Sequence, residues 1–545
     1  MAQGELLPIG PWKRGLNLTA RPEMLELDEL AQAINVLIDD QGGLRPRPGY
    51  NTTLPAFPDH TFHPDLDAKN FSHIAAVLPP ITYTGPTTIS GGNNWIVNQD
   101  SVTQGLYFVP IADDVAYESI KAGAHWTNGF LVFGQSTNLL YVTVRDDDAG
   151  VLEITTDTSP FTVVTLTVWN PTSGNTTTKF PKARVGAKIY ERIFVANGAD
   201  ITPKNRLYFS EPGLPKTWET NNFIDIGNTN KDIHAISFFA DQIIVFFQDE
   251  IYSIQGKDFE GLGLEVTRIS DRLGTASPDS VVEYGGVLFF VDPKQGLHGF
   301  DGSAFHDASR SIWRRGVVDL ASGRRYLADL TQLWGFGQLL VMTVFHSDAV
   351  LDPPYTTTSF VYNVNNGAWT QWNIPIGRTA PWVSSEMIRG HRNATAITNS
   401  LADPSRPLQA TQVFGNRGIA MLAYEFSTDE GTAFTMEART GWIQPVGGFN
   451  KHRIRQLEFR QIDSDIDTIL NVYKDFDLTT AAAGPITLDA SPGEEDGILI
   501  RTHAANGFRW RNMMLKLTAT SSSSQSWGLD GISAEITALP RRRGE

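Results

Sequence analysis

Short apolar runs separated by turns dominate the sequence from about residue 70 to residue 440. Two stretches, 235–254 and 281–300, share one pattern: an apolar run, a tight turn, a more apolar run, another turn and an aromatic-rich run. Apolar runs of four to seven residues without alternation are typical of strands that are buried on both faces. The pattern therefore predicts β-sheets, and not helices, for this part of the chain.

The same pattern recurs along the sequence at a roughly constant interval. Its central runs start near residues 130, 193, 243, 287, 339 and 419, and most starts lie 44 to 63 residues apart. β-Propeller blades recur every ~40–50 residues. The sequence thus predicts an all-β fold with a β-propeller of about six blades, and residues 74–108 are a candidate seventh. A series of β-sandwiches is the alternative, because sandwiches also consist of short strands between turns.

The two ends of the chain have different patterns. The spacing of Leu27, Leu30 and Ile34 predicts a short helix within residues 22–35, and the prolines that follow it favour an extended path. We therefore expect residues 1–60 to form an N-terminal extended arm with a short helix. Residues 61–445 would form the propeller with inserted hairpins. Residues 446–545 contain short runs between turns and predict a C-terminal β-sandwich.

Composition and charge exclude several classes of protein. The 545 residues include no cysteine, which removes disulfides, thiolate metal sites and cysteine nucleophiles. Lys and Arg number 44 against 60 Asp and Glu, a formal charge of -16, whereas gripping nucleic acid over a broad surface requires clustered cations. No apolar run approaches the ~20 residues of a membrane span, and the N-terminus lacks a secretory signal. We therefore expect folding in a cytoplasm.

Motifs that carry catalysis or bind metals are scarce. H-E-x-x-H, G-x-S-x-G and the phosphate-binding loop are all absent from the sequence. Alternate carboxylates between residues 463 and 467 could face a cation, but Thr468 stands where a calcium loop needs glycine. The His and Asp residues within 59–67, with His73 nearby, match no rigid ligand spacing. We expect no cofactor, no metal and no enzymatic activity.

One turn motif is more specific. Ser427, Asp429, Gly431 and Phe434 fit the Asp-box pattern S-x-D-x-G-x-x-aromatic, a hairpin turn that is common in sialidase propellers. Its aspartate satisfies backbone amides of the turn, and its role is structural. The motif occurs once here, whereas sialidases carry several copies and an arginine triad. It therefore predicts a β-hairpin and is weak support for a glycosidase, which needs two opposed carboxylates.

Three passages of the sequence resemble a family of virion proteins. They are Gly15-Leu-Asn17 with Pro22, Leu25, Glu29-Leu30, Ala33-Ile34-Asn35-Val36, Asp39 and Gly43 to Gly49; Arg206 to Gly213 with Trp218 and residues 233–255; and Gly441-Trp442-Ile443 leading to Lys451, Arg453 and Arg455. Together they resemble the tail nozzle or tail hub proteins of short-tailed bacteriophages, which include the packaged-DNA stabilisation proteins. The N-terminal passage is the most specific of the three.

That resemblance implies a structural role in the virion tail, after assembly in the host cytoplasm. Such proteins form a ring of about six copies below the portal and adaptor, with tail fibres or spikes attached outside. Genomic DNA passes through the ring without sequence recognition and without catalysis. An acidic wall is consistent with a DNA conduit, because like charges repel.

Two basic segments are candidates for contacts with partners in such an assembly. The first lies in the arm, which is too short to have a core of its own, and the second is the C-terminal tail. We expect these residues to contact a neighbouring subunit or the adaptor: Arg45, Pro46, Arg47, Pro48, Arg541, Arg542 and Arg543.

Two other functions remain open from the sequence. One is a glycan hydrolase carried on a virion, which predicts a carboxylate pair or an arginine cluster in the mouth of the propeller. The other is a receptor- or glycan-binding propeller at the tail tip, which predicts binding without turnover.

Overall fold

β-Strands make up most of the regular structure in the computed structural model of the chain. No helix in the part of the chain that the structure describes is long and apolar enough to cross a membrane. The described residues are 5–51, 71–84, 88–100, 106–110, 118–121, 131–133, 139–142, 151–155, 162–168, 179–180, 183, 185–190, 192–198, 201–214, 217–256, 263–313, 317, 326–336, 338–347, 355–373, 394–398, 419–423, 427–429, 431–444, 452–462, 466–488, 498–504, 509–521 and 527–539.

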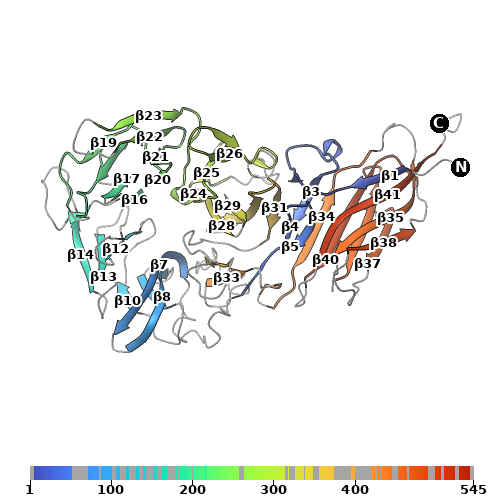
Figure 1. The fold of residues 1–545 in the computed structure, drawn as a ribbon, viewed down its shortest axis with the longest axis horizontal. Coiled ribbons are helices and arrows are strands. Elements are labelled where there is room, and N and C mark those ends of the chain that lie inside the picture. Colours follow the sequence, from blue (N-terminus) through green and yellow to red (C-terminus); the bar gives the residue numbers. More distant parts are fainter. Residues whose placement is uncertain are drawn as a thin grey trace.

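Seven sheets follow one another around a ring between residues 71 and 423 (Figure 1). The first holds β7 (Phe71–Thr84), β8 (Thr88–Asp100), β9 (Leu106–Pro110) and β10 (Glu118–Lys121), and the second holds β11 (Leu131–Phe133), β12 (Leu139–Val142), β13 (Val151–Thr155), β14 (Thr162–Val168) and β15 (Lys179–Phe180). The third holds β16 (Val185–Ile189), β17 (Arg192–Ala196), β18 (Arg206–Phe209) and β19 (Phe223–Asp225), and the fourth holds β20 (Ala235–Phe239), β21 (Gln242–Phe246), β22 (Ile251–Gln255) and β23 (Glu265–Ser270).

The fifth to seventh sheets complete the ring. The fifth holds β24 (Val281–Tyr284), β25 (Val287–Asp292), β26 (Gly296–Phe300) and β27 (Phe305–Asp307), and the sixth begins with β28 (Gln332–Phe336), β29 (Leu339–Ser347), β30 (Tyr355–Asn363) and β31 (Trp369–Trp372). The seventh holds β32 (Ala394–Thr398), β33 (Ile419–Ala423) and β6 (Gly49–Asn51). Since β32 contacts β7, the seventh sheet lies beside the first, and an N-terminal strand completes the last blade.

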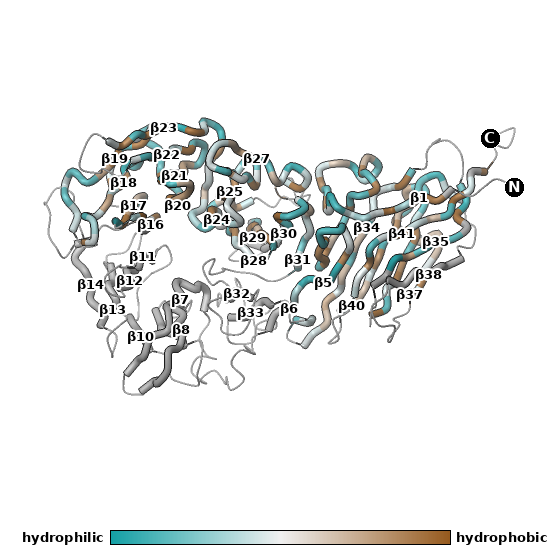
Figure 2. The backbone as a smooth tube through the Cα atoms, viewed as in Figure 1, coloured by the Kyte–Doolittle hydropathy of each residue, from teal (hydrophilic) through white to brown (hydrophobic). Residues whose placement is uncertain are grey.

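The third, fourth and fifth sheets pack face to face through apolar side chains. One buried cluster joins the third and fourth sheets and includes Phe194, Val245 and Ile254. A second joins the fourth and fifth sheets through rings such as Phe246 and Phe290, whose centroids lie 5.2 Å apart. Figure 2 shows hydrophobic residues along β20 and β21, which are formed by apolar runs that recur in the sequence. This packing of successive sheets confirms the all-β propeller fold that the sequence predicts.

The sandwich lies beside the sixth sheet of the propeller (Figure 1). One of its sheets runs β38 (Ile498–Ala504), β35 (His452–Ile462), β41 (Gly528–Ala538), β5 (Leu44–Pro46) and β4 (Val36–Ile38), and β1 (Glu5–Ile9) and β39 (Arg509–Trp510) pair with β41 and β35. The other sheet continues the sixth propeller sheet into β2 (Gly15–Leu16), β3 (Glu29–Ile34), β34 (Thr435–Thr440), β40 (Met513–Thr520), β36 (Thr468–Lys474) and β37 (Ala483–Leu488).

A single ten-stranded sheet therefore belongs to both the propeller and the sandwich. Gly15 of β2 pairs with Trp369 of β31 on one side, while Leu16 pairs with Leu30 of β3. One buried apolar cluster extends across this joint from Phe289 to Leu517. The two parts share backbone hydrogen bonds and a core, and we expect them to move as one body.

The structure corrects the predicted N-terminal helix. Residues 29–34 form strand β3, and the helical structure nearby is a three-residue 3-10 turn, η1 (Pro22–Met24). The pairing of β3 with β34 shifts register between Leu30 and Gln32, so an extra residue separates the buried positions Leu30 and Ala33. Of the three residues whose spacing predicts the helix, only Leu30 is buried: Leu27 precedes β3 and is 38% exposed, and Ile34 is half-buried.

The N-terminal segment also takes a different path from the predicted arm. It contributes β1, β4 and β5 to one sandwich sheet, β2 and β3 to the other, and β6 to the propeller. Strand β34 of the sandwich begins at Thr435, before the predicted boundary at residue 446. The sandwich is thus completed by strands from both ends of the chain, a long-range pairing that local sequence patterns do not reveal.

Candidate functional site

Residues 35–51, which we call the N-terminal strap, link the sixth propeller sheet, the sandwich and the seventh propeller sheet. The strap runs through β4, the turn at 39–43, β5 and β6, and so touches the sixth sheet, the sandwich and the seventh sheet in turn. Two of the five basic residues that the sequence selects as candidate contacts, Arg45 and Arg47, lie in it. Its contacts are therefore the ones that test those candidates.

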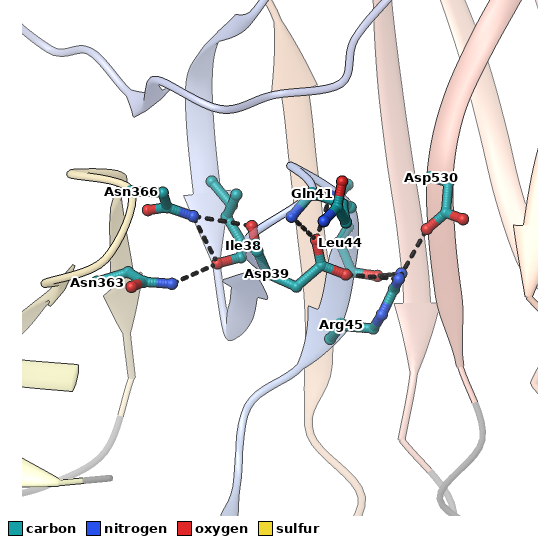
Figure 3. Close-up of polar contacts among 9 residues, drawn as sticks. Ile38, Asp39, Gln41, Leu44, Arg45, Asn363, Asn366 and Asp530 are labelled. Carbon is teal, nitrogen blue, oxygen red and sulfur yellow. Dashed lines mark hydrogen bonds and ion pairs between the residues drawn. The ribbon is translucent and has the colours of Figure 1, made fainter. Parts of the chain in front are cut away.

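The turn at 39–43 is fastened to the propeller (Figure 3). Oδ1 of Asp39 accepts hydrogen bonds from the amides of Gln41, at 2.9 Å, and Gly43, at 2.8 Å. From the sixth sheet, Nδ2 of Asn363 donates to the carbonyl of Ile38 at 3.0 Å, and Nδ2 of Asn366 donates to that of Asp39 at 2.8 Å. Backbone carbonyls of the strap thus find their partners on the propeller, as buried polar groups require.

Arg45 fastens the same turn to the sandwich. Its Nη2 lies 2.5 Å from Oδ2 of Asp39 and 2.7 Å from Oδ1 of Asp530, and Figure 3 shows the guanidinium between the two carboxylates. Asp530 belongs to β41, the last strand of the sandwich. About a quarter of the Arg45 side chain is exposed, at 26%. Arg45 therefore holds two parts of its own chain together at a partly open position.

Arg47 is a buried cation at the centre of the strap. Its side chain is 0% exposed, and Nη1 and Nη2 contact the two carboxylate oxygens of Asp429 at 2.9 and 2.5 Å. The guanidinium carbon lies 3.8 Å from the ring centroid of Phe434, and Nε donates to Oδ1 of Asn35 at 2.9 Å. Two carboxylate bonds, a ring face and an amide together compensate the loss of water around this charge.

Asn35 connects this cation to the rest of the molecule. It adopts a φ of 55°, and its Nδ2 donates to the carbonyl of Thr435 at 2.8 Å. Its Oδ1 also accepts from the amide of Asn373, at 2.8 Å, just beyond the sixth sheet. No motif in the sequence predicts this role for Asn35, although asparagine tolerates a positive φ better than most residues with a side chain.

These contacts correct the prediction that the basic strap residues face a partner. Arg47 and Pro48 are buried within the chain, so neither offers a surface to another molecule. The cause is the carboxylate of Asp429, which a single sequence does not place beside Arg47. Arg45 and Pro46 are half-buried, and no contact with a partner is tested for them. Arg541, Arg542 and Arg543 lie outside the described residues.

The Asp-box turn is tight, but β33 before it and β34 after it pair in different sheets, so the described residues do not form the predicted β-hairpin between flanking strands. Asp429 and Thr432 exchange backbone hydrogen bonds at 2.8 Å in both directions, which makes a tight turn. The carboxylate of Asp429 binds Arg47, and Phe434 forms the stacking face for the same guanidinium. The acidic and aromatic positions of the motif thus serve the strap.

Titratable groups in the propeller have shifted pKa values for structural reasons. Burial raises the pKa of the Glu250 carboxyl, but hydrogen bonds from Lys231 and Tyr252 overcome it and leave the pKa below its ordinary value of 4.5. His306 and the amides of Ala304 and Ser303 hold the pKa of Asp301 well below its ordinary value. These causes are ion pairs and turn hydrogen bonds, which also occur at purely structural positions.

At Asp292, by contrast, burial outweighs the hydrogen bonds. It raises the pKa of this carboxyl above its ordinary value, although the amides of Lys294, Gln295 and Gly274 donate to it. Since Gly274 follows the fourth sheet and Asp292 ends β25 of the fifth, the carboxylate ties two blades together. Within the described ranges, no group of three or more His, Asp or Glu residues is arranged to hold a metal ion. The cluster at 59–67 lies outside those ranges, as do Asp463 and Asp465 of the cluster at 463–467.

Comparison with known proteins leaves the family of this chain open. No protein-family model matches it, and no curated protein matches it. Among solved structures it is similar to the exo-β-1,3-galactanase of Phanerochaete chrysosporium, with 11% identity over 84% of this chain and 99% of that one and a TM-score of 0.25. It is also similar to BamB of Moraxella catarrhalis, with 9% identity over 65% and 90% of the two chains and a TM-score of 0.34.

Proposed function

We propose that the chain is a structural protein of a phage tail, a nozzle or hub that forms a ring of about six copies below the portal and adaptor. In this role it retains the genome, conducts it during ejection and anchors fibres or spikes. The observation that carries the proposal is the strap: the N-terminal passage with the most specific resemblance is also the segment that fastens propeller to sandwich. A passage with that role is under tight structural constraint.

The rigid joint between the two parts supports the same role. A conduit wall must keep its shape under the load of a passing polymer, and here the propeller and the sandwich share one sheet and one core. A platform of this kind presents the loops between its strands to partners at fixed positions. Fibres or spikes would attach at such loops.

The distribution of charge gives further support. Residues 51–434 contain 26 Lys and Arg against 39 Asp and Glu, so most of the excess negative charge belongs to the propeller part of the sequence. A wall of like charge would keep DNA from adhering to it during passage. The charge also predicts that assembly with a basic partner weakens with added salt.

Measurement of the mass of the full chain in solution, alone and with a portal or adaptor protein, tests the proposal. We expect particles of about six subunits of 60.1 kDa with an axial hole in negative stain, formed either alone or on the adaptor. A 60.1 kDa monomer that ignores the adaptor would overturn the proposal. Binding or cleavage of a polysaccharide by that monomer would instead support a glycan-binding propeller or a hydrolase.

A further inference from the structure

The seventh sheet depends on a strand from the opposite end of the chain. The first and the third to sixth sheets each contain four consecutive strands of the sequence, whereas the seventh has β32 and β33 and takes β6 from the strap. The pairing of β6 with β33 joins Tyr50 to Leu422 and Gly49 to Ala423. We call this pairing the seam, because the ring is closed there by the two ends of the propeller sequence.

Strand β6 has only three residues, so its own ladder contributes few hydrogen bonds. The contacts that hold it lie on either side of the seam: Arg47 precedes β6, and Asp429 follows β33. The strap and the Asp-box turn also touch directly, since a Cβ added at Gly49 would overlap the backbone oxygen of Thr428. The Arg47–Asp429 pair therefore fastens both strands of the seam at once.

A buried ion pair of this kind favours two states over intermediate ones. With the pair intact, both charges are compensated; with the pair broken inside the protein, Arg47 would keep only neutral partners and the mostly buried carboxylate of Asp429 would lose its cation. The favourable alternative is release of the whole strap to solvent, where Arg47 and Asp429 are hydrated separately. Because Asn35 links the same cation to Thr435 and Asn373, a displacement of the sandwich or the sixth sheet acts on this one pair.

We propose that the Arg47–Asp429 pair is a buckle whose release opens the seventh sheet at the seam while the third to sixth sheets stay closed. The sandwich end of the strap is then coupled to the closure of the ring. A partner that pulls on the N-terminal strap opens the propeller at this sheet and leaves the third to sixth sheets closed. The inference concerns the single chain and holds whether or not the chain assembles into a ring.

Hydrogen–deuterium exchange of the full chain, read by mass spectrometry, tests the buckle. In Arg47→Ala we expect amides of β6 and β33 to exchange about tenfold faster or more, with β21 and β25 unchanged. The matched control is Arg206→Ala, which removes an arginine that also binds an aspartate and stacks on a phenylalanine, within the third sheet. Equal acceleration in all sheets of Arg47→Ala, or none in the seventh, would overturn the proposal.

Two further variants keep the test informative if Arg47→Ala folds poorly. Gly49→Ala leaves both charges in place but pushes the strap away from Thr428, and it should accelerate the same amides. Because the chain has no cysteine, Tyr50→Cys with Leu422→Cys creates one defined disulfide across the seam. In the Arg47→Ala background, oxidation should restore slow exchange in the seventh sheet and reduction should reverse it. Fast exchange in both redox states would contradict the buckle.

Discussion

Two arginines in this chain have almost the same neighbours and very different surroundings. Arg47 binds Asp429 through two hydrogen bonds of 2.9 and 2.5 Å and lies 3.8 Å from the centroid of Phe434. Arg206 binds Asp225 through two of 2.6 and 2.8 Å and lies 3.6 Å from the centroid of Phe223. The first set joins distant segments, whereas the second joins β18 to its neighbour β19.

The two arginine clusters differ in burial and in how far apart their residues lie along the chain, and not in bond geometry. The Arg206 side chain is 19% exposed and Asp225 is 42% exposed, against 0% and 14% for Arg47 and Asp429. An exposed pair gains little over hydrated charges, whereas the loss of one partner from a buried pair leaves a charge without compensation. The same contacts of an arginine with an aspartate and a phenylalanine should therefore add little stability within one blade and much more where distant segments of the chain meet.

The largest expected effect is that of Arg47→Ala. Removal of the cation leaves the Asp429 carboxylate in a mostly buried site and also removes the ring contact with Phe434. We expect the free energy of unfolding to fall by roughly 3–5 kcal/mol, the usual effect of breaking a buried pair. Urea titration with tryptophan fluorescence measures it. Arg206→Ala, the matched control, should lower it by about 1 kcal/mol or less.

The next prediction distinguishes two causes of the stability loss in Arg47→Ala, namely the uncompensated carboxylate and the lost contacts. If the unpaired carboxylate causes most of the loss, then Arg47→Met combined with Asp429→Leu should recover about half of it or more, because apolar residues can replace a buried pair at little cost. The same titration, run on the single and double variants, measures the coupling. A double variant no more stable than Arg47→Ala would show instead that the hydrogen bonds to Asn35 and the stacking dominate.

The apolar pattern predicted the propeller because the evidence for it is local. The runs at 235–254 and 281–300 coincide with β20 to β22 and β24 to β26, since consecutive strands of one blade pair with each other. The closure of the ring by β6 depends on the pairing of Tyr50 with Leu422, and no local pattern encodes such a pairing. The helix-like spacing of Leu27, Leu30 and Ile34 is misleading for a related reason, because the pairing with β34 and not local periodicity makes residues 29–34 a strand.

The site could be predicted only in part. Arg47 and Asp429 were each singled out, one as a basic residue of an extended arm and one as the acid of a hairpin turn. Their contact could not be foreseen, because it depends on how β6 and β34 lie in space. The resulting error was to treat Arg47 as a surface residue. A charged residue next to proline in an extended segment can be exposed or buried, and the sequence alone does not distinguish the two unless its buried counter-charge is known.

The partly exposed pair of Lys231 and Glu250 in the propeller should have a smaller effect on stability than the Arg47–Asp429 pair, and its effect should depend on pH. The pKa of Glu250 is held below its ordinary 4.5, chiefly by Lys231 against the effect of burial. The folded chain therefore holds this proton less tightly than the unfolded chain. The stability from this pair is complete above about pH 4.5 and is lost as the pH falls through the lowered pKa.

Lys231→Met should remove this dependence. Without its donor, burial dominates and the pKa of Glu250 should rise above its ordinary value. The variant should then lose less of its melting temperature than the parent chain between about pH 5 and pH 3. Lys204→Met is the control, because its pair with Asp232 is longer, at 3.5 Å, and exposed. An identical decrease in Lys231→Met and the parent chain would show that other carboxylates set the acid response.

The smallest expected effect is that of Arg45→Ala, two residues from the buckle. Arg45 contacts Asp39 and Asp530, but it is partly exposed, so water can replace both contacts after the substitution. We expect a loss of about 1 kcal/mol or less in the free energy of unfolding, and no faster exchange at the seam. A loss as large as that of Arg47→Ala would mean that the whole strap, and not its buried pair, fastens the seam. A small loss would place that fastening at Arg47 and Asp429.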